Sequence, residues 1–115
     1  MAAVGLVTSL LLLRPLRRAE IEGASMVPTL LPGDRILLRR RLGSSVRPGD
    51  LVGFADPRPG RSQLLVKRVA TIAGDQVTVL GDNRHGSTDS RDFGPIALEA
   101  ISWIVVRRYA RSSAA

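Results

Sequence analysis

The chain contains no cysteine and only one histidine, His85. Without cysteine it can form neither a disulfide bond nor a thiolate metal site, and it has no cysteine nucleophile. A protein zinc site needs three or four nitrogen, sulfur or oxygen ligands, so a single histidine argues against one. These absences exclude functions built on thiol chemistry and disfavour zinc-dependent ones.

Aromatic residues are also scarce, at 3% of the chain, although 44% of the residues are hydrophobic. Core packing must therefore rest on valine, leucine and isoleucine, which favour pleated surfaces when they fall in short runs. A chain of 115 residues can bury one modest core. The composition predicts a single domain that is mainly β.

Acidic residues are few relative to basic ones, since 10 aspartates and glutamates stand against 17 lysines and arginines, for a formal charge of +7. On charge alone, nucleic acid and an anionic lipid surface both fit as partners. The sequence offers no basic recognition helix and no aromatic platform for stacked bases. We therefore expect no nucleic-acid partner, and at most a weak, peripheral membrane association. The arginines cluster at Arg14, Arg17 and Arg18 and again at Arg39, Arg40 and Arg41.

No hydrophobic run is long enough to cross a bilayer, because the apolar stretch from Ala2 to Leu13 ends at Arg14, short of the ~20 residues that a span needs. A signal peptide would begin with basic residues, whereas here the charges follow the apolar stretch. An interfacial anchor, a helix docked on the domain and a gene start assigned too late are the alternatives. If the stretch inserts, the arginines favour a cytoplasmic domain. We predict an N-terminal segment at 1–19 and a catalytic β domain at 20–115, cytoplasmic or membrane-associated.

After Glu20, short apolar runs alternate with turn-forming clusters such as Pro32-Gly33-Asp34. The runs predict a small, mostly antiparallel sheet or partly open barrel. The segment from Gly81 to Gly94 has no apolar run and is rich in short polar residues, so we expect a structured loop that carries function. The predicted strands are Arg35–Arg39, Leu51–Phe54, Leu64–Ile72, Gln76–Leu80 and Ile101–Tyr109.

Lys67 is the only lysine in the chain and lies within a predicted strand. Burial can remove the proton of a lysine but not that of an arginine, and a neutral amine beside a serine hydroxyl acts as a general base. Ser25 and Lys67 together therefore suggest a serine nucleophile and an amine base. In the alternative interpretation, Lys67 is a solvated lysine on an edge strand and Ser25 only caps the turn before Pro28. Period-two alternation gives one face with Leu65, Lys67, Val69 and Thr71, and another with Leu64, Val66, Arg68, Ala70 and Ile72.

Three motifs in order resemble the signal peptidase I family of membrane-associated serine proteases, over about residues 23–95. Each motif alone is weak, but three in the expected order with these internal spacings are strong evidence. The first is Gly23-x-Ser25-Met26-x-Pro28-Thr29-Leu30 with Gly33-Asp34, the second is Val66-Lys67-Arg68-Val69 with Gly74-Asp75, and the third is Gly81-Asp82-Asn83 with Ser87-x-Asp89-Ser90-Arg91 and Gly94-Pro95.

The resemblance implies a Ser-Lys dyad, with Ser25 as the acylating nucleophile and Lys67 as the general base. The Ser25 backbone N–H would supply one oxyanion donor. Some members place a serine hydroxyl, as a second donor, where this chain has Gly23, so that donor must come from the backbone or is missing. The reaction needs no metal and no organic cofactor.

The resemblance also assigns supporting roles. Ser87 would orient the Lys67 amine, and Met26 would pack beneath the substrate. Asp89 and Arg91 would form an ion pair that holds the loop against the catalytic strand. The supporting residues are Gly23, Met26, Ser87, Asp89, Ser90 and Arg91.

The implied substrate is a precursor protein that loses an N-terminal leader or propeptide after binding as an extended strand at a sheet edge. Only one short strand fits between Asp75 and Gly81, so the chain resembles a minimal catalytic core. Its brevity, its arginine content and the ending Ile104–Tyr109 resemble compact members that mature nickel-type superoxide dismutase. That precursor is the leading substrate hypothesis.

Other functions stay open at this point. A general signal peptidase for exported proteins shares the chemistry, as does a self-cleaving repressor-type peptidase, for whose DNA-binding domain the residues before Gly23 are too few. A Ser-His-Asp site would pair His85 with Asp82 or Asp89. A non-catalytic β module would bind an anionic surface through arginines such as Arg39–Arg41 and would retain its function after Ser25→Ala or Lys67→Ala.

Overall fold

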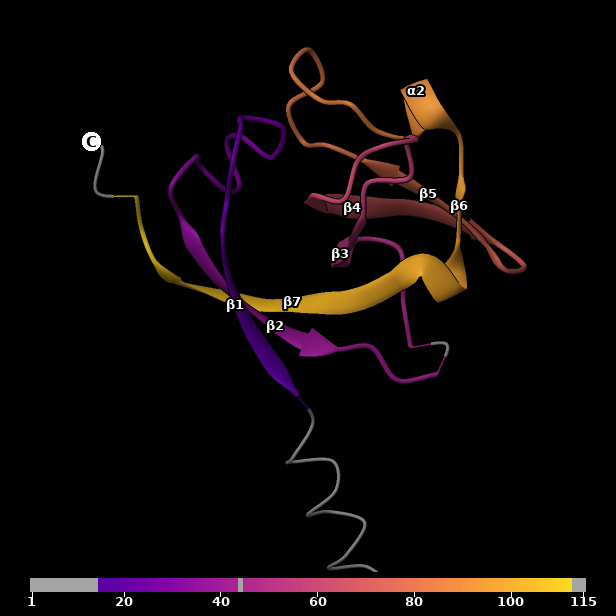
Figure 1. The fold of residues 1–115 in the computed structure, drawn as a ribbon, viewed down its shortest axis with the longest axis horizontal. Helices are drawn as coiled ribbons and strands as arrows, with labels where there is room; N and C mark the ends of the chain where they lie inside the picture. Colours follow the sequence, from indigo (N-terminus) through magenta and orange to yellow (C-terminus); the bar gives the residue numbers. More distant parts are fainter. Residues whose placement is uncertain (1–14, 44, 113–115) are drawn as a thin grey trace, which may run out of the picture.

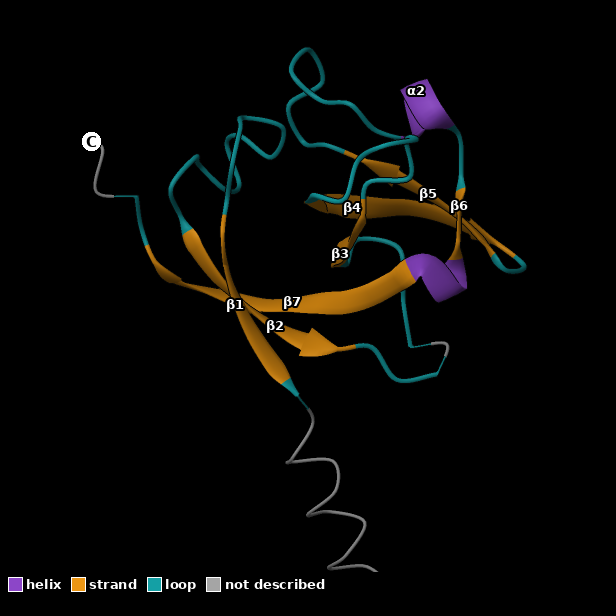
Figure 2. Cartoon of the chain, in the orientation of Figure 1, coloured by secondary structure: helices purple, strands orange, loops and turns teal. Residues whose placement is uncertain are grey.

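A seven-stranded antiparallel sheet forms the body of the molecule (Figures 1 and 2). The computed structural model describes residues 15–43 and 45–112. The strands are arranged in the order β1-β2-β7-β3-β4-β5-β6. Their bounds are β1 Leu16–Glu20, β2 Arg35–Arg40, β3 Leu51–Ala55, β4 Leu64–Ala73, β5 Gln76–Leu80, β6 Ile96–Ala97 and β7 Ile101–Ala110, with a short helix α2 at Ser90–Phe93 and a 3-10 helix at Leu98–Ala100.

The mainly β prediction is confirmed, and all five predicted strands are present with ends displaced by at most one residue. Strand β1 was not predicted, because its sequence LRRAE has no apolar alternation. It forms by pairing along β2, from Leu16 opposite Arg39 to Glu20 opposite Arg35. The predicted apolar stretch from Ala2 to Leu13 lies outside the described residues. Within the described part of the chain, no helix has the length and apolar character of a membrane span.

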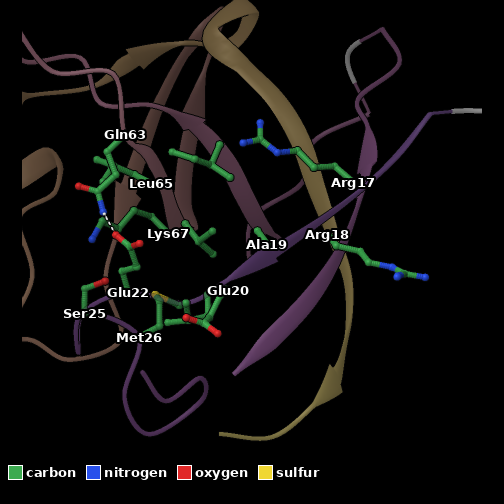
Figure 3. A pocket seen from close by; sticks show the side chains of 13 residues that line it. Arg17, Arg18, Ala19, Glu20, Glu22, Ser25, Met26, Gln63, Leu65 and Lys67 are labelled. Atoms are coloured by element: carbon green, nitrogen blue, oxygen red, sulfur yellow. Dashed lines mark hydrogen bonds between the residues drawn. The ribbon is translucent and has the colours of Figure 1, made fainter. Parts of the chain in front are cut away.

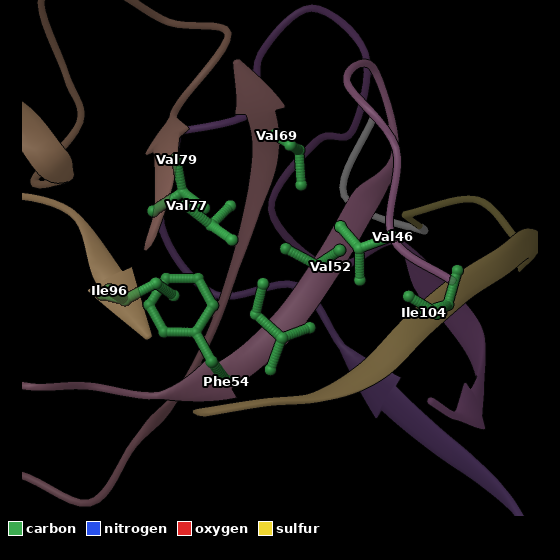
Figure 4. Close-up of a cluster of buried hydrophobic side chains, with 9 residues drawn as sticks. Val46, Val52, Phe54, Val69, Val77, Val79, Ile96 and Ile104 are labelled. Carbon is green, nitrogen blue, oxygen red and sulfur yellow. The ribbon is translucent and has the colours of Figure 1, made fainter. Parts of the chain in front are cut away.

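The central strands serve two hydrophobic cores, one on each face of the sheet. On β3, Phe54 belongs to the first core, whereas Leu51, three residues earlier, packs against the second. The side chains of β4 are divided between the two cores in the same way. This double burial explains why these strands are apolar on both faces. The first core (Figure 4) consists of Val46, Val52, Phe54, Val69, Val77, Val79, Ile96, Ile101 and Ile104, and the second of Ile21, Met26, Leu30, Ile36 and Leu38.

A β-bulge at Ala70 changes which face the second half of β4 presents. Val69 pairs with Val79 on β5, but the next pair is Thr71 with Thr78, so one residue of β4 is left over. Beyond it the alternation is reversed. Ile72 therefore packs against the first core together with Val69, while Thr71 is exposed. The sequence prediction that placed Thr71 with Lys67, and Ile72 on the opposite face, is wrong for this reason.

Two of the edges that lack a strand partner in the described residues lie on β1 and β4, apart from the edge at β6. Strand β1 ends the sheet, so only its β2 side is paired. On β4, residues Leu64–Lys67 pair with β3 on one side, but pairing with β5 on the other side begins only at Arg68. Each of these edges presents backbone N–H and C=O groups that an added strand can use.

Candidate active site

A pocket of about 320 Å3 lies between these two edges (Figure 3). Its walls are residues 17–22, from β1 and the turn that follows, and residues 63–67, from the start of β4. Ser25 and Met26 complete the lining. The fold therefore brings Ser25 and Lys67 to one pocket, although they lie in different motifs of the sequence.

Ser25 lies in a compact turn that is anchored in the second core. Met26 is 1% exposed and packs with Ile21 and Leu30, and the Leu30 N–H donates to the Met26 carbonyl at 2.9 Å. Gly23 enters the turn with φ +72°, a left-handed conformation that favours glycine. Neither the N–H nor the hydroxyl of Ser25 has a hydrogen-bond partner within the described residues. Both groups are thus available to a substrate.

Lys67 is the buried cation of the pocket, with 4% of its surface exposed. Burial lowers the pKa of its amine, because water no longer solvates the charged form, and the nearby negative charge of Asp89 opposes this effect. Within residues 15–43 and 45–112, the Lys67 amine forms no hydrogen bond and no ion pair. An amine with a lowered pKa and no carboxylate bound to it is suited to accept a proton.

The structure shows no hydrogen bond between Ser25 Oγ and Lys67 Nζ, nor one between Ser87 and Lys67. Ser87 Oγ instead donates to Asp89 Oδ2 at 2.7 Å, which leaves its oxygen as an acceptor. Hydrogen bonds between catalytic groups are often long in the absence of substrate. The role of Ser87 in orienting the amine therefore stays a prediction.

Asp89 holds the third motif together from a fully buried position, at 0% exposure. It forms an ion pair with Arg91 at 2.6 Å and accepts from the Gly81 N–H at 2.8 Å as well as from Ser87. These bonds hold the pKa of Asp89 well below its usual range, against the opposing effect of burial. Ser90 supports the same loop, since its hydroxyl accepts from the Val79 N–H at 2.9 Å. The loop is thus fixed to the end of β5.

Asp82 and Asn83 tie this loop to the nucleophile turn, a role that the sequence analysis did not assign. Asp82 accepts two bonds from Arg68, at 2.9 and 2.8 Å, and one from the Thr29 hydroxyl. Asn83 donates its backbone N–H to the Ser25 carbonyl at 2.8 Å and its amide to the Ala24 carbonyl at 3.0 Å. Their place in the motif was the only available signal, because the sequence does not reveal these partners.

At Gly81, three segments of the chain approach one another closely: Gly81 itself, the turn that holds Ser25 and the loop that holds Ser87. A Cβ at this position would lie 2.6 Å from the Ser25 carbonyl oxygen and would also overlap the Ser87 side chain. A contact of that length is not tolerated, so a larger residue would push the nucleophile turn and the loop apart. Glycine here therefore sets the distance between Ser25 and the third motif.

The alternative Ser-His-Asp arrangement is not formed. His85 is exposed and has no hydrogen bond within the described residues. Asp82 is bonded to Arg68, and Asp89 is bonded to Arg91. Both candidate carboxylates are therefore committed to arginine. In the same described residues, no group of three or more His, Cys, Asp and Glu side chains is placed to hold a metal ion.

A second buried carboxylate, Asp56, is close enough to Lys67 to affect its pKa. It is 5% exposed and forms an ion pair with Arg58 at 2.7 Å, which lowers the pKa of Asp56 to about 2. Arg58 in turn contributes to lowering the pKa of Lys67, while Asp56 acts in the opposite direction. The amine is thus surrounded by carboxylates whose charges arginines already balance.

Comparison with known proteins finds similar peptidases. The family model described as signal peptidase, peptidase S26, matches residues 1–80. The chain is 34% identical to mitochondrial ATP-independent inner membrane protease subunit 1a of Arabidopsis thaliana, over 71% of this chain and 63% of that protein. It is 33% identical to mitochondrial inner membrane protease subunit 2 of Mus musculus, over 70% of this chain and 59% of that protein.

A bacterial relative matches over a shorter region. The chain is 34% identical to signal peptidase I U of Bacillus subtilis, over 56% of this chain and 35% of that protein. With 63% and 59% coverage, the chain spans about three fifths of the length of the two mitochondrial relatives.

Proposed function

This chain belongs to the signal peptidase family S26, and from that membership we propose that it is a serine endopeptidase with a Ser25–Lys67 dyad that removes an N-terminal leader or propeptide from a precursor protein. The observation that carries the proposal is the position of Lys67. It is a buried amine with a lowered pKa and, in the described residues, no ion-pair partner, in the pocket that Ser25 also lines.

The proposed reaction is acyl transfer to water. Ser25 Oγ attacks the carbonyl carbon of the scissile peptide bond while neutral Lys67 accepts the hydroxyl proton. The resulting ammonium then gives a proton to the departing amine, and the acyl group is left as an ester on Ser25. Water, deprotonated by Lys67, attacks the ester and releases the new carboxyl end, which restores both side chains.

The oxyanion that forms in each step needs hydrogen-bond donors. The free N–H of Ser25 is one, and a preorganised donor of this kind contributes about a hundredfold or more in rate. Gly23 has no side chain and adopts φ +72°. We therefore propose that the second donor is a backbone group or that this enzyme works with one donor.

The substrate would bind as an extended strand between β1 and β4. Both walls of the pocket are strand edges that lack a partner in the described residues, so a peptide between them can hydrogen-bond to residues 17–22 on one side and 63–67 on the other. Met26 lies at the floor beside Ser25 and would contact the side chain next to the cleaved bond. This is the basis for proposing a protein substrate.

We propose two candidate substrates. The nickel superoxide dismutase precursor is the leading one, on the resemblance of this short, arginine-rich chain to compact family members, and a general signal peptidase substrate is the alternative. Two of the relatives are inner membrane protease subunits by name, so we propose a membrane-associated site of action. The division into a segment at 1–19 and a catalytic domain at 20–115 is part of the same proposal.

The first experiment is cleavage of both purified precursors by the wild-type chain, Ser25→Ala and Lys67→Ala. We expect cleavage of one precursor by the wild type and a loss of at least a thousandfold in both variants, with unchanged circular dichroism. Ser45→Ala, which removes an exposed hydroxyl, is the matched control and should cleave normally. Cleavage that survives in folded Ser25→Ala would refute the dyad, whereas a folded wild type that cuts neither precursor would favour the binding-module alternative.

A further inference from the structure

A second hollow, which we call the distal hollow, continues the substrate pocket along the sheet. It measures about 190 Å3 and shares Arg17 and Leu64 with the pocket that contains Ser25 and Lys67. Because the two hollows meet at these side chains, a peptide strand that leaves the active site along β1 would run directly into the distal hollow. Its lining is Arg17, Ala55, Ser62, Leu64, Ser102 and Trp103.

The distal hollow is built from groups that suit an anion. Arg17 supplies a guanidinium, and Ser62 and Ser102 supply hydroxyl donors. In the described residues Arg17 has no carboxylate partner, unlike Arg68 and Arg91, which are bound to aspartates. Its positive charge is therefore available to a ligand.

The Trp103 ring holds this charge in place. The guanidinium carbon of Arg17 lies 5.7 Å from the ring centroid, and that of Arg40 lies 5.4 Å from it. A guanidinium over an aromatic face is attracted electrostatically and loses side-chain freedom before any ligand binds.

The neighbouring arginine provides a contrast. Arg18 lies next to Arg17 on β1, yet its side chain leaves the strand in the opposite direction (Figure 3). Its guanidinium lies 5.7 Å from the ring of Tyr109 rather than over Trp103. The two residues thus carry the same charge and the same kind of aromatic contact, but only Arg17 lines the distal hollow.

From this arrangement we infer that the distal hollow is a specificity subsite for an acidic side chain of the precursor, several residues from the cleaved bond. Arg17 lies on β1, which ends at Glu20 before the turn that holds Ser25, so the subsite is set back from the cleaved bond along a peptide strand that advances ~3.3 Å per residue. Only every second residue of that peptide faces the hollow. The inference rests on the proposed function, since it assumes that a peptide occupies the pocket.

The test is a position scan of Glu, Gln and Lys through a fluorogenic peptide taken from whichever precursor is cut. The scan covers positions four to eight on both sides of the scissile bond. We expect Glu to be favoured over Gln by about three- to tenfold in kcat/KM at alternate positions on one side only, as for a partly exposed charge-assisted contact. The effect should appear in KM, because the contact is present in both ground and transition states.

The variants Arg17→Gln and Arg18→Gln separate the subsite from general charge. Arg17→Gln should abolish the preference for Glu, while Arg18→Gln should retain it. Equal loss in both variants, or equal cleavage of Glu and Lys peptides by the wild type, would refute the inference while leaving the proteolytic function intact.

Binding without catalysis gives an independent readout. Trp103 is the only tryptophan of the chain, so in Ser25→Ala its fluorescence reports on the distal hollow alone. We expect the Glu peptide to change this fluorescence and to bind about three- to tenfold more tightly than the Gln peptide. If only anionic phosphatidylglycerol vesicles change the signal, the hollow faces a membrane and the inference is wrong. If neither precursor is cut, Glu and Gln peptides that span the leader junctions of both precursors are used, and this binding assay still decides the inference.

Discussion

The clearest structural prediction concerns Asp89, whose carboxylate accepts five hydrogen bonds. Oδ2 faces the Gly81 N–H at 2.8 Å, the Ser87 hydroxyl at 2.7 Å and Arg91 Nη2 at 2.6 Å. Oδ1 faces the backbone N–H and Nε of Arg91, at 3.1 and 3.0 Å. In Asp89→Asn, one oxygen becomes an NH2 group. Whichever way the amide turns, at least two of these donors then face another donor.

The cost can be worked out from these contacts. Two lost hydrogen bonds to the buried Asp89 carboxylate, together with an Arg91 contact that loses its counter-charge, amount to about 3–5 kcal/mol. For a domain of this size, 1 kcal/mol lowers Tm by roughly 4 °C, so Asp89→Asn should melt about 12–20 °C below wild type. Asp50→Asn is the matched control, since Asp50 accepts one bond from the Arg47 N–H at an exposed turn. It should change Tm by less than about 4 °C.

The pH dependence supplies a second check on Asp89. Its pKa is lower in the folded state than the ordinary value of about 3.9. The carboxylate therefore stabilises the fold above that pH, and the stabilisation is lost as the pH falls through the folded-state pKa. Urea unfolding between pH 7 and pH 2 should show a shallower acid loss in Asp89→Asn than in wild type. Equal slopes, or a Tm drop no larger than that of Asp50→Asn, would refute the reasoning.

Three further predictions follow from the site. Burial lowers the pKa of Lys67 from 10.5, so the 15N resonance of this single lysine should titrate below that value. The kcat/KM for cleavage should rise with pH through the same inflection. A titration midpoint at 10.5 or above would contradict the role of burial. Arg68→Lys loses the two-point contact with Asp82, so we expect urea unfolding to show a destabilisation of about 1–3 kcal/mol. The control Arg61→Lys, at an exposed loop position, should change the free energy of unfolding by less than about 0.5 kcal/mol, as is usual for surface substitutions. Gly81→Ala should cost about 1–3 kcal/mol through steric overlap and reduce cleavage at least tenfold; full activity would show that Ser25 tolerates displacement of the loop.

Most of the sheet could be predicted from the sequence because its strands are apolar runs bounded by proline and glycine turns. Strand β1 could not, since Leu16 is 63% exposed and the strand forms through its partner β2 rather than through its own pattern. Helix α2 was also missed, although Asp89 and Asp92 form a capping box, a signature that the sequence does display. The bulge at Ala70 carries no such mark and appears only in the pairing with β5.

The same contrast holds for the site. Ser25 and Lys67 were predicted because each belongs to a recognisable motif and their side-chain chemistry is complementary. The hydrogen bonds that Asp82 and Asn83 form were not predicted, because several other groups in the chain could have been their partners equally well. A sequence gives the groups that need partners, whereas the choice of partner depends on three-dimensional distances.

These hydrogen bonds join residues that lie far apart in the sequence, so they can form only after most of the chain has been synthesised. The Asn83–Ala24 contact joins residues 59 positions apart, and the Asp82–Thr29 contact joins residues 53 apart. During synthesis the nucleophile turn leaves the ribosome first and has nothing to bond with until the third motif follows. Contacts of this sequence separation form late and slowly. On the proposed mechanism, the nascent chain therefore carries Ser25 long before the contacts that complete the site can form.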